Sequence, residues 1–152
     1  MSPPNDPKAR GELTEVIILA ELVKHGYEVL LPWGDNQRYD MALDLGDGRM
    51  LRAQCKTGRL RSGTILFEAR SVNWNTKMHR DYRGQADIFL VYCYETRKVY
   101  WRDVSDVGTA TGSLRVDSTQ RVAGVHWAAD HELPEAAEAL APYLDCTAST
   151  PV

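Results

Sequence analysis

The first apolar pattern in the chain has the spacing of an amphipathic helix. Asp6 and Pro7 supply an N-cap and the residue favoured at the first helical position, and Gly26 can adopt the left-handed conformation that ends a helix. Between them, apolar residues recur at helical intervals and define the face that we expect to pack on a sheet: Leu13, Val16, Ile17, Ala20 and Val23. Two carboxylates of this predicted helix, Glu12 and Glu15, lie one turn apart.

A second pattern predicts a β-hairpin between Met41 and Ala53. Apolar runs lie on both sides of Gly46-Asp47-Gly48, and an Asp-Gly pair between two such runs is a strong hairpin signal. Side chains alternate along a strand, so Gln54 and Lys56 are expected on one face of the second strand.

The remaining periodicity is typical of an α/β domain. Short apolar or alternating runs predict strands at 27–31, 65–70, 88–94 and 99–101, and an Ala- and Glu-rich run predicts a helix at 134–144. Residues 71–83 are polar, aromatic and basic with little periodicity, and we expect a long functional loop or a short helix there. Residues 146–152 are expected to be frayed.

Length and composition favour a single compact domain. The chain has 152 residues, 43% of them hydrophobic, which is enough for an ordinary core. The three cysteines, at positions 55, 93 and 146, have neither the spacing of a disulfide framework nor that of a zinc site. No apolar stretch is long enough to cross a membrane, and the first residues lack the features of a signal peptide, so we expect a cytoplasmic protein.

The distribution of charge changes the picture given by the net charge of −3. Residues 49–83 contain nine basic and two acidic residues, a net +7, so the rest of the chain carries −10. A local basic segment is the electrostatic footprint of a partner with a phosphate backbone. The side chains that we expect to contact DNA are Arg59, Arg61, Arg70, Lys77, His79, Arg80 and Arg83.

The predicted hairpin brings Asp40, Gln54 and Lys56 together, and this set suits a metal-dependent phosphodiesterase. Asp40 is a hard oxygen ligand for Mg²⁺, and the side-chain amide of Gln54 and the backbone carbonyl of Cys55 can add two further oxygens. Lys56 can orient or deprotonate the attacking water and offset negative charge in the transition state.

Three motifs follow one another along the chain: Arg10-Gly11 with Glu15, Gly34-Asp35 with Tyr39-Asp40, and Gln54-Cys55-Lys56. This order resembles the PD-(D/E)XK nuclease superfamily. The chain is most similar to the group I intron-associated homing endonucleases of cyanobacterial type, whose third motif is Gln-x-Lys. Tyr82-Arg83-Gly84-Gln85 and the apolar run 88–92 also resemble that group. Two departures from the superfamily are Tyr39, which replaces a proline, and Gln54, which removes one anionic metal ligand.

The resemblance implies a restriction-endonuclease-like α/β fold, a mixed central sheet flanked by helices with the site at one edge. It implies one nuclease domain, residues 1–152, with its core at about 8–103 and a C-terminal extension at 104–152. It implies a Mg²⁺-dependent endonuclease of double-stranded DNA, with Mn²⁺ as a substitute cation. It selects Glu15 over Glu12 as a metal ligand and catalytic residue beside Asp40, Gln54 and Lys56. Cleavage of both strands by a chain with one site implies a homodimer or homotetramer, and residues 104–152 are the candidate contact with the second subunit or with DNA.

Two other functions stay open at this point. A structure-selective nuclease like an archaeal Holliday junction resolvase shares the Gly-x-x-x-Glu helix and the hairpin motif, and it would cut four-way junctions in preference to linear duplex. A DNA-binding module on a decayed nuclease fold would have Gln54 as the first sign of lost chemistry. Such a module would bind DNA without metal and without nicking it.

Overall fold

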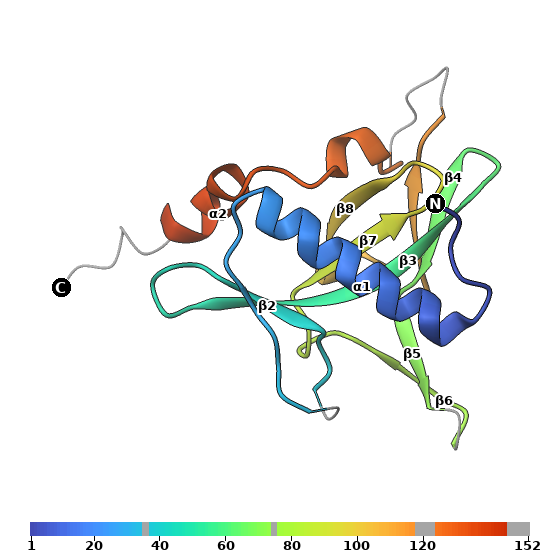
Figure 1. The fold of residues 1–152 in the computed structure, drawn as a ribbon, viewed down its shortest axis with the longest axis horizontal. Helices are drawn as coiled ribbons and strands as arrows, with labels where there is room; N and C mark the ends of the chain where they lie inside the picture. The colour runs from blue at the N-terminus through green and yellow to red at the C-terminus, as the bar shows by residue number, and fades with distance from the viewer. Residues whose placement is uncertain (35–36, 74–75, 118–123, 146–152) are drawn as a thin grey trace.

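The centre of the molecule is a mixed β-sheet, drawn in Figure 1 from the computed structural model, which describes residues 1–34, 37–73, 76–117 and 124–145. Seven of the described strands belong to this sheet: β1 (Val29–Leu30), β2 (Met41–Asp44), β3 (Met50–Arg61), β4 (Thr64–Glu68), β7 (Ile88–Cys93), β8 (Lys98–Asp103) and β9 (Thr111–Arg115). The β3 and β7 strands are parallel, and the other pairs are antiparallel. The mixed sheet predicted from the sequence is therefore confirmed.

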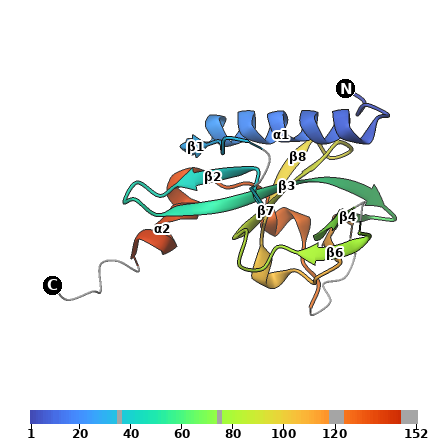
Figure 2. The same ribbon diagram turned by 90° about the horizontal axis from the view of Figure 1, so that it is seen from below.

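The sheet separates two hydrophobic cores, and β7 contributes to both. Its residues Ile88, Leu90 and Tyr92 face the core beneath the helices α1 (Pro7–Lys24) and α2 (Ala136–Asp145). The alternate residues of β7 face the second core, which is shared with β4, β9 and the short 3-10 helices η1 (Val104–Asp106) and η2 (Ala128–His131). Figure 2 shows α1 along one side of the sheet. Every residue of β7 is buried, as expected for a strand with both faces covered.

The α1 helix begins and ends where the sequence predicts, but it turns a different face to the sheet. The Asp6 carboxylate accepts a hydrogen bond from the backbone N–H of Ala9 at 2.8 Å, and Gly26 has φ +87° directly after the helix. The buried positions are Thr14, Ile18 and Leu22. The predicted face was partly wrong: Val16 and Val23 are 62% and 60% exposed, and Ala20 is also exposed, whereas Leu13 and Ile17 are partly buried. A buried threonine was not anticipated because its hydroxyl is polar, and its partners come from distant strands.

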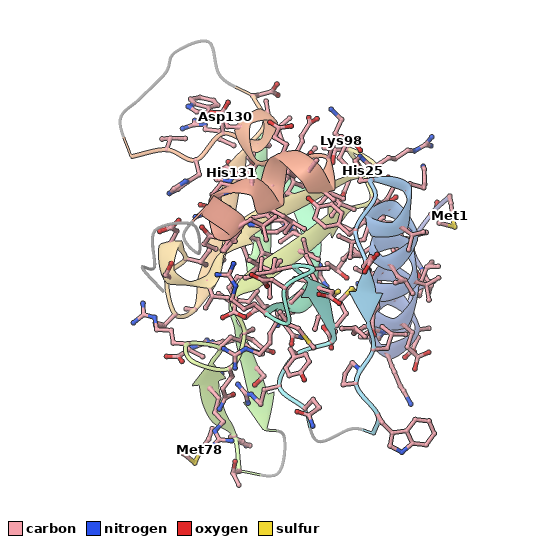
Figure 3. All side chains as sticks on the ribbon, turned by 90° about the vertical axis from the view of Figure 1, so that its left-hand side faces the viewer. Met1, His25, Met78, Lys98, Asp130 and His131 are labelled. Atoms are coloured by element: carbon pink, nitrogen blue, oxygen red, sulfur yellow. The ribbon has the colours of Figure 1, made fainter. Side chains whose placement is uncertain are left out.

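Two paired strands occupy residues 70–73 and 78–81, so the prediction of a loop or short helix at 71–83 was wrong. Strand β5 (Arg70–Asn73) pairs antiparallel with β6 (Met78–Asp81) in a separate two-stranded sheet. Figure 3 shows Met78 at the outer end of this hairpin, away from the helices. All four residues of β6 are exposed, which explains why no apolar alternation marks this strand in the sequence.

The C-terminal part of the described chain packs onto the same body. Strand β9 pairs with β4, and its Leu114 is fully buried in the second core. The α2 helix overlaps the predicted range 134–144 but ends one residue later, and it packs Ala136, Ala139 and Leu140 on the first core. The frayed ending predicted for 146–152 lies outside the described residues. Among the helices that are described, none is both long and apolar enough to span a bilayer.

Close packing around β3 predicts a large effect of one methyl group. A Cβ atom at Gly58 would lie 2.7 Å from Ile65 Cγ2 and 3.0 Å from Val91 Cγ1, whereas a Cβ at Gly11 would meet nothing within 4 Å. We expect Gly58→Ala to destabilise the fold by about 1–3 kcal/mol through overpacking. Gly11→Ala should stabilise it by roughly 0.5–1 kcal/mol, because Gly11 lies within a helix. Denaturant unfolding of both variants checks this, and equal effects would contradict the packing described for β3.

Candidate active site

The candidate site lies where the long strand β3 loses its neighbour on one edge. The β2 strand pairs with β3 only as far as Met41 and Ala53, and β4 joins β3 only from Arg59. On the other edge, β7 pairs with residues 53–58 without interruption. Residues 54–58 of β3 therefore have one edge covered by β7 and the other free of both β2 and β4. This stretch is called the open segment below.

Asp40 bridges the point at which β2 leaves β3. Its backbone N–H donates to the carbonyl of Ala53 at 2.9 Å, and its carboxylate accepts from the backbone N–H of Cys55 at 2.8 Å. The N–H and C=O groups of one strand residue point to the same edge. The carbonyl of Cys55 therefore lies on the edge that Asp40 occupies, so that two oxygen donors share this edge.

A cluster of hydroxyl groups places Glu15 beside this edge. Thr14 Oγ1 lies 2.7 Å from Thr57 Oγ1 on β3 and 3.2 Å from the hydroxyl of Tyr94. Thr14 precedes Glu15 on the helix, and Thr57 follows Lys56 on the strand. The contact between the Thr14 and Thr57 hydroxyls therefore places this part of α1 next to the open segment. Sequence analysis did not identify Thr14, Thr57 or Tyr94 as positioning residues.

The two carboxylates oppose one another electrostatically. Burial, more than any other influence, raises the pKa of Asp40, although the Cys55 N–H and the Lys56 charge act in the opposite direction. Burial also raises the pKa of Glu15, and the charge of Asp40 adds to this. Both partly buried carboxyls have raised pKa values, and a bound cation would stabilise their ionised forms.

The donor set at the open segment fits a hard divalent cation. In the described ranges, no group of three or more His, Cys, Asp or Glu side chains is arranged to hold a metal. The oxygens available are the carboxylates of Asp40 and Glu15 and the carbonyl of Cys55. Burial raises the pKa of the Cys55 thiol well above its usual range, so Cys55 offers its carbonyl and not a thiolate. An all-oxygen set that leaves positions for water and phosphate is typical of Mg²⁺ sites.

Gln54 and Lys56 lie next to these oxygens on β3. Both side chains are partly buried, and strand alternation places them on one face of the sheet, as the sequence predicts. The Lys56 ammonium donates to the hydroxyl of Tyr82 at 3.2 Å and lies 4.6 Å from the centre of the Tyr82 ring. Arg38 also stacks on this ring, with its guanidinium carbon at 4.9 Å. Sequence analysis did not anticipate that Arg38 and Tyr82 lie beside Lys56, although both are next to the motifs that it used.

The predicted DNA-binding residues fall into two groups. Arg59 and Arg61 line a groove of about 490 Å³ together with Lys56, so these two continue directly from the candidate site. The second group is on or next to the β5–β6 hairpin and is not brought to that groove; it consists of Arg70, Lys77, His79, Arg80 and Arg83. Arg70 is partly buried, and the other four are exposed.

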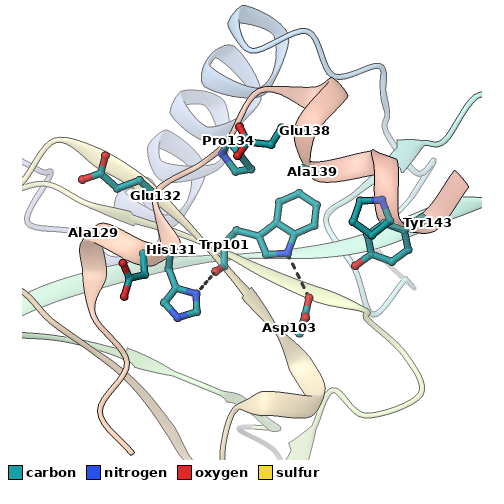
Figure 4. A pocket seen from close by; sticks show the side chains of 11 residues that line it. Trp101, Asp103, Ala129, His131, Glu132, Pro134, Glu138, Ala139 and Tyr143 are labelled. Carbon is teal, nitrogen blue, oxygen red and sulfur yellow. Dashed lines mark hydrogen bonds between the residues drawn. The ribbon is translucent and has the colours of Figure 1, made fainter. Parts of the chain in front are cut away.

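A separate pocket of about 520 Å³ lies between β8 and α2 (Figure 4). Its wall contains Trp101, whose indole N–H donates to Asp103 at 3.2 Å, and it also contains Asp130, Glu132 and Glu138. Four carboxylates make this pocket a poor receptor for a phosphate backbone. It shares no lining residue with the candidate site.

The protein has a restriction-endonuclease-like α/β fold. Its mixed sheet is covered by the helix that carries Glu15, and Asp40 lies where β2 separates from β3. The family model described as PD-(D/E)XK endonuclease matches residues 5–134, and the chain therefore belongs to this family. The superfamily predicted from the ordered motifs is confirmed. Enzymes of the family are nucleases that typically use a divalent metal.

The fold is shared with a solved structure. The bacterial homing endonuclease I-Ssp6803I is 23% identical, with a TM-score of 0.69 over 96% of this chain and 98% of that chain. The Holliday junction resolvase Hjc of the archaeal hyperthermophile Archaeoglobus fulgidus is 15% identical, with a TM-score of 0.46 over 86% of this chain and 95% of that chain. The comparison with curated proteins gave no match.

The raised carboxyl pKa values predict an effect of neutralising Asp40. A raised pKa means that the folded state binds the proton more tightly, so the destabilising effect of the charge grows as pH rises through the raised pKa and is absent at lower pH. With a chelator at neutral pH, Asp40→Asn should therefore unfold at higher denaturant than the wild type, and this advantage should vanish as pH falls. Added Mg²⁺ should stabilise the wild type and not the variant.

Asp47→Asn is the matched control, because hydrogen bonds from Arg49 lower the pKa of Asp47 and the effect should have the opposite sign. Denaturant unfolding at several pH values measures both variants. The cation site would be contradicted if Asp40→Asn unfolds at lower denaturant than the wild type in chelator and Mg²⁺ does not change the stability of the wild type.

Proposed function

We propose that this protein is a Mg²⁺-dependent endonuclease that hydrolyses phosphodiester bonds in double-stranded DNA, as homing endonucleases do. The observation that carries the proposal is the Asp40 carboxylate on the N–H of Cys55, with Glu15 and Lys56 beside it at the open segment. Membership of the PD-(D/E)XK endonuclease family supports the reaction class. The fold shared with I-Ssp6803I supports the choice of a homing-endonuclease-like enzyme, and a DNA substrate is consistent with the cytoplasmic location that we expect.

The proposed reaction assigns a separate task to each side chain. Asp40, the carbonyl of Cys55, Glu15 and the amide oxygen of Gln54 would hold Mg²⁺, with Mn²⁺ as a substitute. When bound, the cation supplies Lewis-acid stabilisation of the charge that develops on the attacked phosphate. Lys56 orients or deprotonates the attacking water and offsets negative charge in the transition state. Its hydrogen bond to Tyr82 holds the ammonium group near Asp40.

Two basic surfaces are proposed to hold the duplex. Arg59 and Arg61 extend from the active site along the groove and are suited to the phosphates next to the scissile bond. Lys77, His79 and Arg80 lie on the β5–β6 hairpin, and a two-stranded ribbon of this kind has dimensions that fit the major groove of DNA. Arg70 and Arg83 lie at the base of the hairpin, where they would contact the backbone.

Cleavage of both strands requires two active sites, so we propose a homodimer or homotetramer. In a two-fold assembly, each site faces one strand of the duplex. We propose a single nuclease domain over residues 1–152, and the extension 104–152 stays our candidate for the contact with the second subunit or with DNA.

The first test of this function is the loss of catalysis in Asp40→Ala. We expect the wild type to linearise supercoiled plasmid with Mg²⁺ and not with a chelator, and Asp40→Ala to be inactive. The variant should bind DNA as tightly as the wild type or more tightly, because it lacks a negative charge near the phosphates. Cleavage by the Asp40→Ala variant at the wild-type rate would overturn the assignment. Preference for a four-way junction would indicate a resolvase, and metal-independent binding without nicking by the wild type would indicate a binding module.

The basic groove predicts a change in the salt dependence of DNA binding. In the Asp40→Ala background, Arg59→Gln and Arg61→Gln should each lower affinity for all sequences. Each should also reduce the slope of log K against log salt by about 0.9, because one phosphate contact is lost. The control is Glu138→Gln on α2, which should leave the slope unchanged. Fluorescence anisotropy at several salt concentrations measures this, and unchanged slopes in the arginine variants would place the DNA elsewhere.

A further inference from the structure

Tyr82 holds two cationic side chains on one aromatic ring. The guanidinium carbon of Arg38 lies 4.9 Å and the ammonium nitrogen of Lys56 lies 4.6 Å from the ring centre. The ring is 5% exposed, and its inner side packs against Phe89 in an edge-to-face contact at 5.6 Å. Because both cations lie over the same ring, neither can be further from the other than the sum of these two distances. Two positive charges are thus held on one ring beside the site.

The charge of Lys56 lowers the pKa of Asp40, but neither cation is held in a close ion pair among the residues that the structure describes. Across the described ranges, neither Arg38 nor Lys56 forms an ion pair with a carboxylate. Arg38 donates one hydrogen bond, from Nη2 to the carbonyl of Asp81 at 2.9 Å, and its buried Nε has no partner. Two like charges on one ring, one of them with an unsatisfied buried donor, have the chemistry of an anion receptor.

The position of Tyr82 does not depend on these two cations. Tyr82 begins a tight turn in which its carbonyl accepts from the N–H groups of Gln85 and Ala86. Arg52 clamps this turn, since its side chain donates to the carbonyl of Gly84 at 3.1 Å and pairs with Asp87. The ring is therefore fixed by β3 and by the turn. Arg38 and Lys56 contact the ring but are not needed to keep it in place.

We propose that Arg38 is a second phosphate-binding residue of the active site and that Tyr82 is the positioning residue for both Arg38 and Lys56. The proposal rests on the proposed nuclease function. Arg38 lies two residues before Asp40, and its guanidinium fork can bind a phosphate oxygen next to the one that Lys56 serves. A phosphodiester of the DNA backbone fits this place, because the cations lie next to the oxygens proposed to hold Mg²⁺. The shared ring positions both cations.

The test compares Arg38→Gln, Arg38→Lys and Tyr82→Phe with the control Lys24→Gln, which removes a charge from the exposed end of α1. Arg38→Gln should lower the cleavage rate at saturating DNA about ten-fold or more, and Arg38→Lys should restore part of that loss. Tyr82→Phe keeps the ring and removes the hydroxyl that accepts from Lys56. It should therefore lower kcat several-fold with little change in KM. Lys24→Gln should cleave like the wild type. Thermal unfolding verifies that each variant is folded.

The same variants in the Asp40→Ala background separate this proposal from the nuclease assignment. Arg38→Gln should reduce the slope of log K against log salt for duplex DNA by about 0.9, and Lys24→Gln should not. If the wild type cleaves and Arg38→Gln cleaves equally well with an unchanged slope, the role of Arg38 is overturned and the nuclease function stands. If the wild type cleaves no DNA, the nuclease function fails, and the slope alone decides whether Arg38 binds phosphate. Equal kcat in Tyr82→Phe and wild type would overturn the positioning role.

Discussion

The hydrogen bond from the Cys55 backbone N–H to the Asp40 carboxylate is the contact on which the site depends. A charge-assisted bond of this kind contributes about 1.5–3 kcal/mol, and it replaces the strand pairing that ends when β2 leaves β3. Without the carboxylate, the open segment would expose an unpaired strand edge. With it, the edge becomes a place where a carboxylate and a carbonyl converge, and the parallel strand β7 holds the opposite edge rigid.

The charges around this edge are arranged in two opposed sets. The charge of Asp40 disfavours ionisation of Glu15, and burial disfavours ionisation of both carboxyls. Lys56 and Arg38 lie on the Tyr82 ring, and neither forms an ion pair with a carboxylate in the described part of the chain. A divalent cation and a phosphodiester bound together would satisfy both sets. The free protein thus keeps unfavourable electrostatics that the proposed ligands would relieve, which is common at functional sites.

Short-range signals in the sequence predict most of the site, and long-range contacts explain what they miss. The Asp-Gly turn and strand alternation are local, so the β2–β3 hairpin and the shared face of Gln54 and Lys56 could be predicted. The buried face of α1 could not, because Thr14 is buried through hydroxyl contacts with Thr57 and Tyr94, 43 and 80 residues away. The β5–β6 hairpin was missed because a ribbon exposed to solvent needs no apolar alternation. The meeting of Arg38 and Tyr82 depends on the turn clamped by Arg52, which no local pattern reports.

A crystal structure of the protein with Mn²⁺ and duplex DNA tests the central claim most directly, because anomalous scattering locates the cation independently of the protein atoms. The account predicts an anomalous peak bound by the carboxylate of Asp40 and the backbone carbonyl of Cys55, with a phosphate of the DNA on the same ion. A peak that touches neither residue, in crystals whose protein cleaves DNA with Mn²⁺ in solution, would contradict it.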